Sequence, residues 1–256
     1  MSNIRLDKLT RQQINEITRD SIVVLPIGAT EQHGPHLPLS VDNLIITEVA
    51  KRACLQLKNE LQIYSAPVIN YGNSHHHLPY PALSLSSETV LQVLKDLLRS
   101  LAITGFQKIM ILNSHGGNDE ALRIATRDIS REEQICIGAA SYWSLSWDSL
   151  ANAEALYSGR VPGHAGGFET SLMLALAPEE VQLDNLPDKW KHEIPPSQKQ
   201  TSKRLFIQKP GQSVGKEGIS DDASQASKDK GEQFLEIIVK DVCHSIKLFN
   251  NQCIKE

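Results

Sequence analysis

The chain has 256 residues, of which 40% are hydrophobic and 22% charged, an ordinary composition for a globular protein with one large α/β domain. The formal net charge of -4 predicts no nucleic-acid partner, and no apolar stretch is long enough to span a membrane. Because the N-terminus is polar and the four cysteines form no CxxC pair, we expect a cytoplasmic protein with unpaired thiols and neither a zinc cage nor disulfides.

The first half of the chain alternates strand-like and helix-like segments. The β-branched run at 22–27 predicts a buried strand whose proline marks an end or an edge, and 62–69 is a second strand candidate. Apolar residues at helical spacing predict a helix from Asp42 and an amphipathic helix over 87–105 with a serine N-cap.

The same alternation continues in the second half. The pattern predicts strands at 108–112 and 135–141, and helices at 118–133, 168–177 and about 223–249. Strands that alternate with helices favour a parallel sheet covered by helices on both faces. We therefore expect an α/β fold in three layers, α/β/α, with a mainly parallel sheet.

The pattern fails only between residues 185 and 218, a proline-rich segment with several lysines and glutamines. Segments of this length without periodicity are usually functional loops or disordered. We interpret it as a long loop or flap within a single domain that spans residues 1–256.

Coordinating side chains follow each predicted strand. In open parallel sheets, ligands bind beyond the carboxyl ends of the strands, where such side chains meet. In chain order the candidates are Glu31, His33 and His36 after the first strand, His75, His76 and His77 after the second, His115 after the third, and Tyr142 and Trp143 after the fourth.

The segment 28–42 holds two carboxylates and two imidazoles. Glu31 and His33 are two residues apart, so in an extended segment they point the same way. Mixed carboxylate and imidazole ligands suit Zn²⁺, Mn²⁺ or Fe²⁺. Asp42 opens a helix, and its two oxygens could bridge a metal pair. The alternative is a loop of turn residues with Asp42 as a plain helix N-cap.

Two further segments offer ligands. His115 precedes two glycines that let the backbone approach a bound group, although a lone histidine after a strand also suits a structural role. His164 and Glu169 are five residues apart, which is poor spacing for one helix face, so we expect His164 in a loop and only Glu169 on the helix. The alternative for Glu169 is an acid that complements the helix dipole.

These segments together resemble the creatininase (creatinine amidohydrolase) family. The resemblance rests on Gly-Ala-Thr-Glu-Gln-His-Gly-Pro-His-Leu-Pro-Leu at 28–39, Asp42, Asn-Ser-His-Gly-Gly-Asn at 113–118 and Gly-His-Ala-Gly-Gly-Phe-Glu-Thr-Ser at 163–171, and it covers nearly the whole chain. It implies an α/β/α fold, a homohexamer and two divalent metals per chain, with zinc favoured over manganese or iron. It also implies hydrolysis of an amide C–N bond, other than an ordinary peptide bond, by metal-activated water.

The resemblance implies a ligand set with one shared carboxylate: Glu31, Asp42 and His115 for one metal, and His33, Asp42 and a second carboxylate for the other. In creatininase proper that carboxylate lies two residues after the strand-end histidine, where this chain has Gly117. The resemblance implies that relatives with the same His-Gly-Gly-Asn form use a glutamate of the His-Ala-Gly segment in place of that carboxylate. In this chain the glutamate is Glu169.

The resemblance also implies catalytic roles for His164, which would move a proton to the leaving nitrogen, and for Trp143, which would stack on the substrate. Gly116 and Arg160 stand where creatinine-hydrolysing members carry tyrosine and tryptophan, and the stretch 81–85 is about one residue shorter than in the family. The expected substrate is therefore a small-molecule amide, either cyclic and creatinine-like or of formamide type, and a peptide-tail substrate is also compatible. These departures argue against creatinine itself. Arg160 is interpreted as a surface residue or as a partner for an anionic substrate group.

The sequence also offers a serine hydrolase and a non-catalytic metal-binding protein as alternative functions. Gly211 to Gly215 matches the nucleophile elbow of serine hydrolases with Ser213 as nucleophile, but no suitable helix is predicted after it. A metal-binding oligomer without turnover is the non-enzymatic alternative. The run His75 to His77 is interpreted as a solvated loop, with His77 as a candidate pocket residue.

Overall fold

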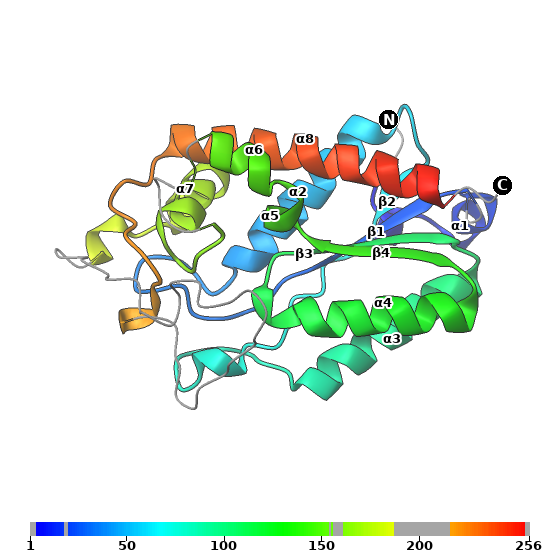
Figure 1. Ribbon diagram of the computed structural model, residues 1–256, viewed down its shortest axis with the longest axis horizontal. Helices are drawn as coiled ribbons and strands as arrows, with labels where there is room; N and C mark the ends of the chain where they lie inside the picture. Colours follow the sequence, from blue (N-terminus) through cyan, green and yellow to red (C-terminus); the bar gives the residue numbers. More distant parts are fainter. Residues whose placement is uncertain (1–3, 18–19, 154, 156–160, 187–215, 254–256) are drawn as a thin grey trace.

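The computed structural model describes residues 4–17, 20–153, 155, 161–186 and 216–253. Within this part of the chain, parallel strands form one sheet in the order β2-β1-β3-β4 (Figure 1). The strands are β1 (Ile22–Ile27), β2 (Ile63–Ser65), β3 (Lys108–Asn113) and β4 (Cys136–Ser141). The predicted sheet is confirmed, although β2 is much shorter than the expected 62–69.

The register aligns the carboxyl ends of three strands. Ile27 of β1 lies opposite Asn113 of β3, which in turn lies opposite Ser141 of β4. Segments that leave these strands therefore begin at the same edge of the sheet. This is the edge at which the sequence predicts the coordinating side chains to meet.

Helices cover both faces of the sheet (Figure 1). One face carries α2 (Val41–Leu57), α5 (Tyr142–Leu145), α6 (Trp147–Asn152), α7 (Gly167–Leu176) and α8 (Lys228–Gln252), and the other carries α3 (Ser87–Thr104) and α4 (Asp119–Glu133). The described residues also include α1 (Arg11–Ile17) and the short 3-10 helices η1 (Leu6–Lys8), η2 (His75–His77), η3 (Gly116–Asn118), η5 (Pro178–Glu180), η6 (Leu183–Asn185) and η8 (Lys216–Gly218). The expected three-layer α/β/α architecture is confirmed.

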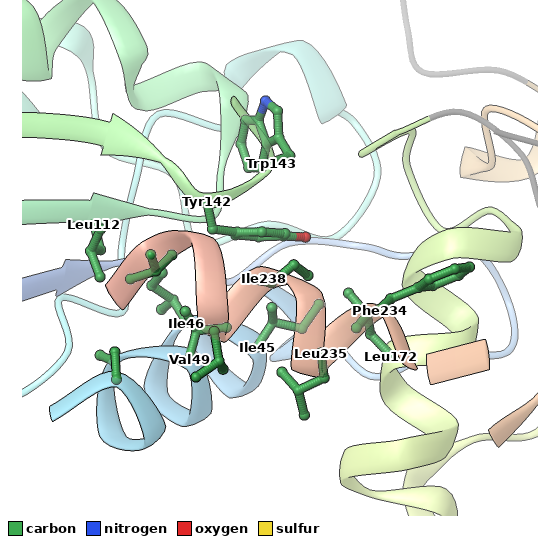
Figure 2. Close-up of a cluster of buried hydrophobic side chains, with 14 of the residues drawn as sticks. Ile45, Ile46, Val49, Leu112, Tyr142, Trp143, Leu172, Phe234, Leu235 and Ile238 are labelled. Carbon is green, nitrogen blue, oxygen red and sulfur yellow. The ribbon is translucent and has the colours of Figure 1, made fainter. Parts of the chain in front are cut away.

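Each face of the sheet has its own hydrophobic core. Side chains of β1 alternate between them, with Ile22 and Val24 in one cluster and Val23, Leu25 and Ile27 in the other. Figure 2 shows the first cluster, in which α2 and α8 supply the labelled residues Ile45, Ile46, Val49, Phe234, Leu235 and Ile238. A strand buried on both faces needs apolar residues at every position, which explains the unbroken apolar run of β1.

Pro26 lies at the end of β1 and not at an edge of the sheet, since β1 is an interior strand. Its missing N–H faces the side of β2, which ends at Ser65 after pairing with Val24. On that side the carbonyl of Pro26 accepts a hydrogen bond from the amide of Ile69 at 2.9 Å. The proline is tolerated because no strand is left there to need its N–H.

Two helix ends show how capping sets the boundaries. Ser86 caps α3 as expected, because its hydroxyl accepts a hydrogen bond from the Thr89 amide at 3.2 Å. The last helix was expected from about Ala223 but begins at Lys228. The hydroxyl of Ser227 accepts from the Lys230 amide at 3.3 Å and caps the helix at that later point.

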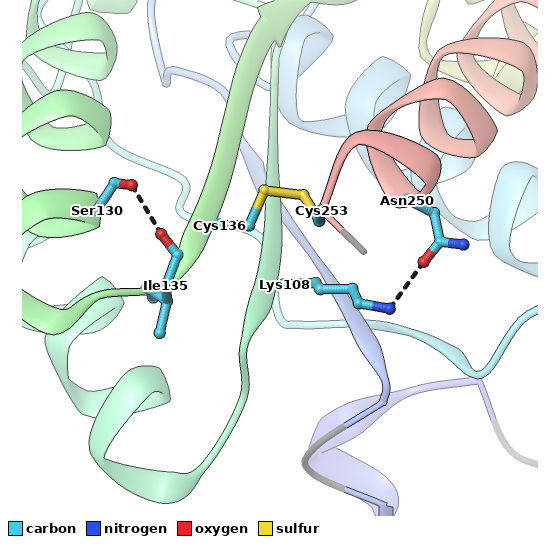
Figure 3. The surroundings of a disulfide bond; sticks show 6 residues. All are labelled: Lys108, Ser130, Ile135, Cys136, Asn250 and Cys253. Carbon is cyan, nitrogen blue, oxygen red and sulfur yellow. Dashed lines mark hydrogen bonds between the residues drawn. A yellow bond between two sulfur atoms is a disulfide. The ribbon is translucent and has the colours of Figure 1, made fainter. Parts of the chain in front are cut away.

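The prediction that all cysteines are unpaired is wrong for one pair. Cys136 at the start of β4 and Cys253 just after α8 form a disulfide (Figure 3). They are 117 residues apart, so only the folded topology brings them together. Cys54 and Cys243 are buried free thiols, as expected. Because one pair of cysteines is joined, the cysteines no longer serve as an argument for a reducing compartment.

Most of the predicted loop or flap at 185–218 lies outside the described residues, as do Arg160 and Ser213. Among the residues that are described, no helix is long and apolar enough to cross a membrane.

Candidate metal centre

Ionisable side chains gather at the carboxyl edge of the sheet and are withdrawn from solvent. Each is at most 4% exposed, and together they are Glu31, His33, Asp42, His77, His115 and Glu169. Burying charged groups is costly unless they are paired or bind a metal. Such a concentration is not the surface polarity of an ordinary loop.

Asp42 lies between two imidazoles. Its Oδ1 is 3.7 Å from Nε2 of His33, and its Oδ2 is 3.4 Å from Nδ1 of His115. Two ligands of one tetrahedral zinc ion are about 3.3–3.4 Å apart when the bonds are about 2.0–2.1 Å. Ser40 and not Asp42 is the N-cap of α2, so the plain capping interpretation of Asp42 is wrong. Its carboxylate is free to face two metal positions.

The remaining expected ligands complete a group on each side of Asp42. On one side, Oε1 of Glu31 lies 3.2 Å from Nδ1 of His115. On the other, Oε2 of Glu169 lies 3.8 Å from Nε2 of His33. The structure thus brings together all five residues that the sequence nominated, and their division between two metals stays a prediction.

The tautomers of both histidines are fixed by backbone carbonyls. Nδ1 of His33 donates to the Glu31 carbonyl at 3.0 Å, and Nε2 of His115 donates to the Asn73 carbonyl at 2.7 Å. The other nitrogen of each ring therefore presents its lone pair to the carboxylates. Lone pairs facing carboxylate oxygens repel each other until a cation or a proton lies between them.

Unpartnered atoms support the fit to metal. Within the described part of the chain, Glu31 Oε2, His33 Nε2 and Asp42 Oδ2 are buried and form no hydrogen bond. Buried polar atoms without partners are rare in folded proteins and call for an explanation such as an ion. The donor set of carboxylates and imidazoles suits Zn²⁺, Mn²⁺ or Fe²⁺.

Without metal, protons take the place of the cation. Burial alone lowers the pKa of His33, but the carboxylates of Asp42, Glu169 and Glu31 outweigh it and raise that pKa to about 9. Burial raises the pKa of Glu169 to about 8, with Asp42 and Glu31 adding to the effect and His33 opposing it. A metal that binds here must displace protons from the site.

A network of asparagines holds His115 in place. Asn113 donates to the His115 carbonyl at 2.7 Å and accepts from the His115 amide at 3.1 Å. Asn118 donates to Asn113 at 3.2 Å and accepts from the Asn73 amide at 3.1 Å. His115 is thus both held like a structural residue and directed at the carboxylates.

The two glycines after His115 differ sharply. A Cβ at Gly117 would overlap the carbonyl oxygen of Asn73 and come within 2.6 Å of His115 Nε2, whereas a Cβ at Gly116 would meet nothing within 4 Å. The family's carboxylate is therefore not merely absent at 117, because no side chain of any kind fits there. Gly116, by contrast, leaves open space.

Glu169 and His164 lie as the sequence predicted, with Glu169 in the first turn of α7 and His164 in the loop before it. Oε2 of Glu169 accepts from the amide of Ala165 at 2.7 Å, so the residue also stabilises the helix start. Nδ1 of His164 is 3.7 Å from Oε1 of Glu31, and its ring centre is 4.3 Å from that of His33. Burial, and then His33, lower the pKa of His164 well below its usual value, which keeps the ring neutral.

The solvated-loop interpretation of the histidine run holds for His75, which is exposed, but is wrong for His77, which is buried. The side-chain oxygen of Gln32 accepts from the Gly34 amide at 2.9 Å, so its nitrogen is the atom that faces His77 Nδ1 at 2.9 Å. Nδ1 of His77 therefore accepts, and its Nε2 carries the proton and faces Glu31 Oε1 at 2.9 Å. His77 is also the residue of this run that the sequence indicated as a candidate pocket residue, and it lies against the buried cluster.

Trp143 is buried in the first hydrophobic cluster, where it packs edge-to-face on Tyr142 with ring centres 5.1 Å apart (Figure 2). Its stacking role toward a substrate stays a prediction. The hydroxyl of Tyr142 is buried and forms no hydrogen bond within the described residues. Burial, then the charges of Glu169 and Asp42, raise the pKa of Tyr142 well above its usual value.

An α/β/α sheet that carries this cluster at its carboxyl edge is the framework of a metal-dependent hydrolase. The family model described as "Creatininase: Creatinine amidohydrolase" matches residues 7–246. The chain therefore belongs to the creatininase family, and it is a metal-dependent amidohydrolase that acts on carbon–nitrogen bonds other than ordinary peptide bonds.

Two curated relatives differ in what they act on. The chain is 31% identical to the creatinine amidohydrolase of Pseudomonas putida over 245 residues, which cover 89% of each protein. It is 34% identical to the mycofactocin precursor peptide peptidase of Mycobacterium ulcerans over 170 residues, which are 64% of this chain and 62% of the peptidase. The family thus includes a small-molecule amidohydrolase and a peptidase.

Solved creatininase structures have the same fold. The manganese form of creatininase superimposes with a TM-score of 0.81 at 28% identity, over 96% of this chain and 98% of that one. A creatininase mutant of the Zn-Zn type gives a TM-score of 0.79 at the same identity and coverage. The expected fold and the expected class of metal-dependent hydrolase are confirmed.

Proposed function

We propose that this chain hydrolyses its amide substrate at a pair of divalent metals held by Glu31, His33, Asp42, His115 and Glu169. The observation that carries the proposal is the division of the Asp42 carboxylate, with Oδ1 facing His33 at 3.7 Å and Oδ2 facing His115 at 3.4 Å. One carboxylate lies between two imidazoles, and each imidazole has a further carboxylate beside it. This arrangement provides ligands for two cations, more than a single cation requires.

Metals held by these residues would supply a Lewis acid for the amide carbonyl and a water molecule of lowered pKa. Zinc is favoured and manganese or iron are alternatives, since all three accept this donor set. The protein's own part is to fix the donors. Asp42 sets the spacing of the two positions, and the carbonyls of Glu31 and Asn73 fix the imidazole tautomers.

His164 is the proposed proton carrier. Its Nε2 donates to the Gln32 carbonyl at 2.7 Å, which leaves the lone pair of Nδ1 directed toward Glu31. The side chain is 12% exposed, whereas the side chain of His33 is fully buried. A neutral imidazole at the open side of the cluster can accept a proton and return it to the departing nitrogen. Trp143 is proposed to stack on the planar amide.

The proposed substrate is an amide larger than creatinine, such as a peptide-tail amide, with a formamide as the smaller alternative. Gly116 is exposed and a Cβ there would meet nothing within 4 Å, so no other side chain of the described residues takes the place of the tyrosine that creatinine-hydrolysing members carry. Similarity to the mycofactocin precursor peptide peptidase points the same way.

The test begins with metal analysis of the protein reconstituted with Zn²⁺ or Mn²⁺, for which we expect two ions per chain. A hydrolysis screen then compares creatinine, other cyclic amides, formamidopyrimidines and short peptides, with Asp42→Ala as the inactive control. Protein that binds no metal under these conditions contradicts the proposal. Ser213→Ala should keep full activity, because the serine-hydrolase alternative alone requires that hydroxyl.

The cytoplasmic location expected from the sequence, and the homohexamer that the family resemblance implies, are further parts of the proposal. Light scattering of the purified chain tests the hexamer. Mass spectrometry of thiols trapped in intact cells tests the location, since a reducing cytosol is expected to leave much of the Cys136–Cys253 pair reduced.

A further inference from the structure

The short helix η2 (His75–His77) places three consecutive imidazoles in three different environments. His75 is exposed to solvent, and His77 is buried between Gln32 and Glu31. His76 is half-buried and lies against the metal centre, yet within the described residues its ring forms no hydrogen bond. Its nitrogens are thus available to a ligand, whereas Nδ1 of His77 is already engaged by Gln32.

The ring of His76 lies parallel to that of His115, with ring centres 5.5 Å apart and an angle of 11° between the planes. One ring nitrogen of His76, one of His115 and a carboxylate oxygen of Glu31 all lie within 4.8 Å of one another. Two ligands of one tetrahedral zinc ion are about 3.3–3.4 Å apart when the bonds are about 2.0–2.1 Å. A small movement of His76 would therefore allow it to share a metal with Glu31 and His115.

The backbone that carries His76 is fastened to the same group. The carbonyl of Asn73 accepts the 2.7 Å hydrogen bond from His115, and the amide of Ser74 donates to Ser84 at 2.8 Å. The turn then closes through the His77 amide, which donates to the Ser74 carbonyl at 3.0 Å. His76 is thus held beside His115 by the turn itself and not by a flexible loop.

We propose that His76 is an additional ligand of the metal held by Glu31, Asp42 and His115. The inference rests on the proposed two-metal function and deepens it. This metal then has four protein ligands, which is the number found in closed structural sites, while the metal of His33, Asp42 and Glu169 has three and keeps an open position. The two metals are therefore unequal, and the second is the one that a water or substrate atom can reach.

The experiment measures zinc affinity and not activity. Metal-free protein is titrated with Zn²⁺ against a chromophoric chelator, for the wild type and for His76→Ala, with the adjacent exposed residue replaced in His75→Ala as the matched control. We expect two zinc ions per wild-type chain and at least a tenfold loss of affinity at one of them in His76→Ala. His75→Ala should match the wild type.

A second measurement reports coordination directly. Substitution with Co²⁺ should give a visible spectrum that changes in His76→Ala and in the more conservative His76→Asn, but not in His75→Ala. Circular dichroism checks that each variant is folded. If both His76 variants bind two zinc ions as tightly as the wild type and give an unchanged cobalt spectrum, this inference alone is overturned. If the wild-type protein binds no metal, the proposed function is overturned as well.

Discussion

The two ends of the parallel sheet differ in how completely their side chains are bonded. At the amino end, the Cys136–Cys253 disulfide joins β4 to the end of α8, and Lys108 of β3 donates to Asn250 of α8 at 3.0 Å (Figure 3). At the carboxyl end, by contrast, buried atoms such as Glu31 Oε2 and Asp42 Oδ2 are left without hydrogen bonds.

The amino end of the sheet therefore contributes to stability, whereas the carboxyl end carries the candidate metal centre. A buried polar atom without a partner costs about 1–3 kcal/mol, so the carboxyl end weakens the metal-free fold. The amino end offsets this cost with a covalent cross-link. Proteins commonly break local rules where they bind ligands and compensate elsewhere, and here the compensation is at the far end of the sheet.

Removing the cross-link is expected to have the largest effect on stability. In Cys253→Ser the free energy of unfolding should fall by up to about 4–5 kcal/mol, because the disulfide closes a loop of more than a hundred residues. Urea unfolding of the oxidised protein measures the change. Reductant should destabilise the wild type and leave the variant unaffected; equal sensitivity in both would contradict the contribution of the disulfide.

Removing the shared carboxylate should act on metal binding and activity as well as on stability. In Asp42→Ala we expect both metals to be lost and activity to fall by more than about a hundredfold, since loss of an outer partner alone can cost that much. The metal-free fold should also lose stability, because the protonated His33 is left without the carboxylate that does most to raise its pKa. Metal analysis and urea unfolding test both halves, with the exposed Asp148→Ala as control. Retention of one tightly bound metal would contradict bridging.

The adjacent residues Gly116 and Gly117 are expected to respond differently to substitution by alanine. Gly117→Ala should destabilise the fold by about 1–3 kcal/mol, because the new methyl group overlaps the Asn73 carbonyl. Gly116→Ala, next to it, should change the unfolding free energy by less than about 0.5 kcal/mol. Urea unfolding of the two variants side by side makes the measurement, and equal effects would contradict the packing described here.

A pH dependence of the metal-free protein is also expected. The pKa of His33 is raised to about 9, above its unfolded value of about 6.5, so its protonation stabilises the fold fully below pH 6.5. That contribution is lost as the pH rises through 9. Unfolding in the presence of chelator at pH 6.5 and pH 9 should show the decline, and His33→Gln should flatten it. A wild type that is more stable at pH 9 would reverse the expected sign.

Local patterns were enough to predict much of the molecule. The bounds of β1 follow from a run of apolar residues, and the position of Asp42 and His115 after separate strands follows from the rule for parallel sheets. Neither depends on contacts between distant segments. The rule for parallel sheets made Glu31, His33 and His115 candidates, whereas the full ligand set with Asp42 and Glu169 was implied by the resemblance to the creatininase family.

Features made by distant segments could not be predicted in this way. The Cys136–Cys253 pair depends on how α8 returns across the sheet, and the burial of His77 depends on Gln32, which is 45 residues away. The sequence named His77 as a candidate pocket residue, but three identical side chains in a row could not show that His75 is exposed and His77 is buried. Only the turn that holds them decides which one faces the metals.

The close approach of Gly117 to Asn73 also limits how this centre can have diverged from its relatives. A carboxylate at 117 would push away the carbonyl that orients His115, so the two ligand plans exclude each other. A single codon change at 117 would therefore disturb the existing site without creating the other. A side chain at 117 therefore requires the segment around Asn73 to change with it, so these two distant segments are coupled at this site.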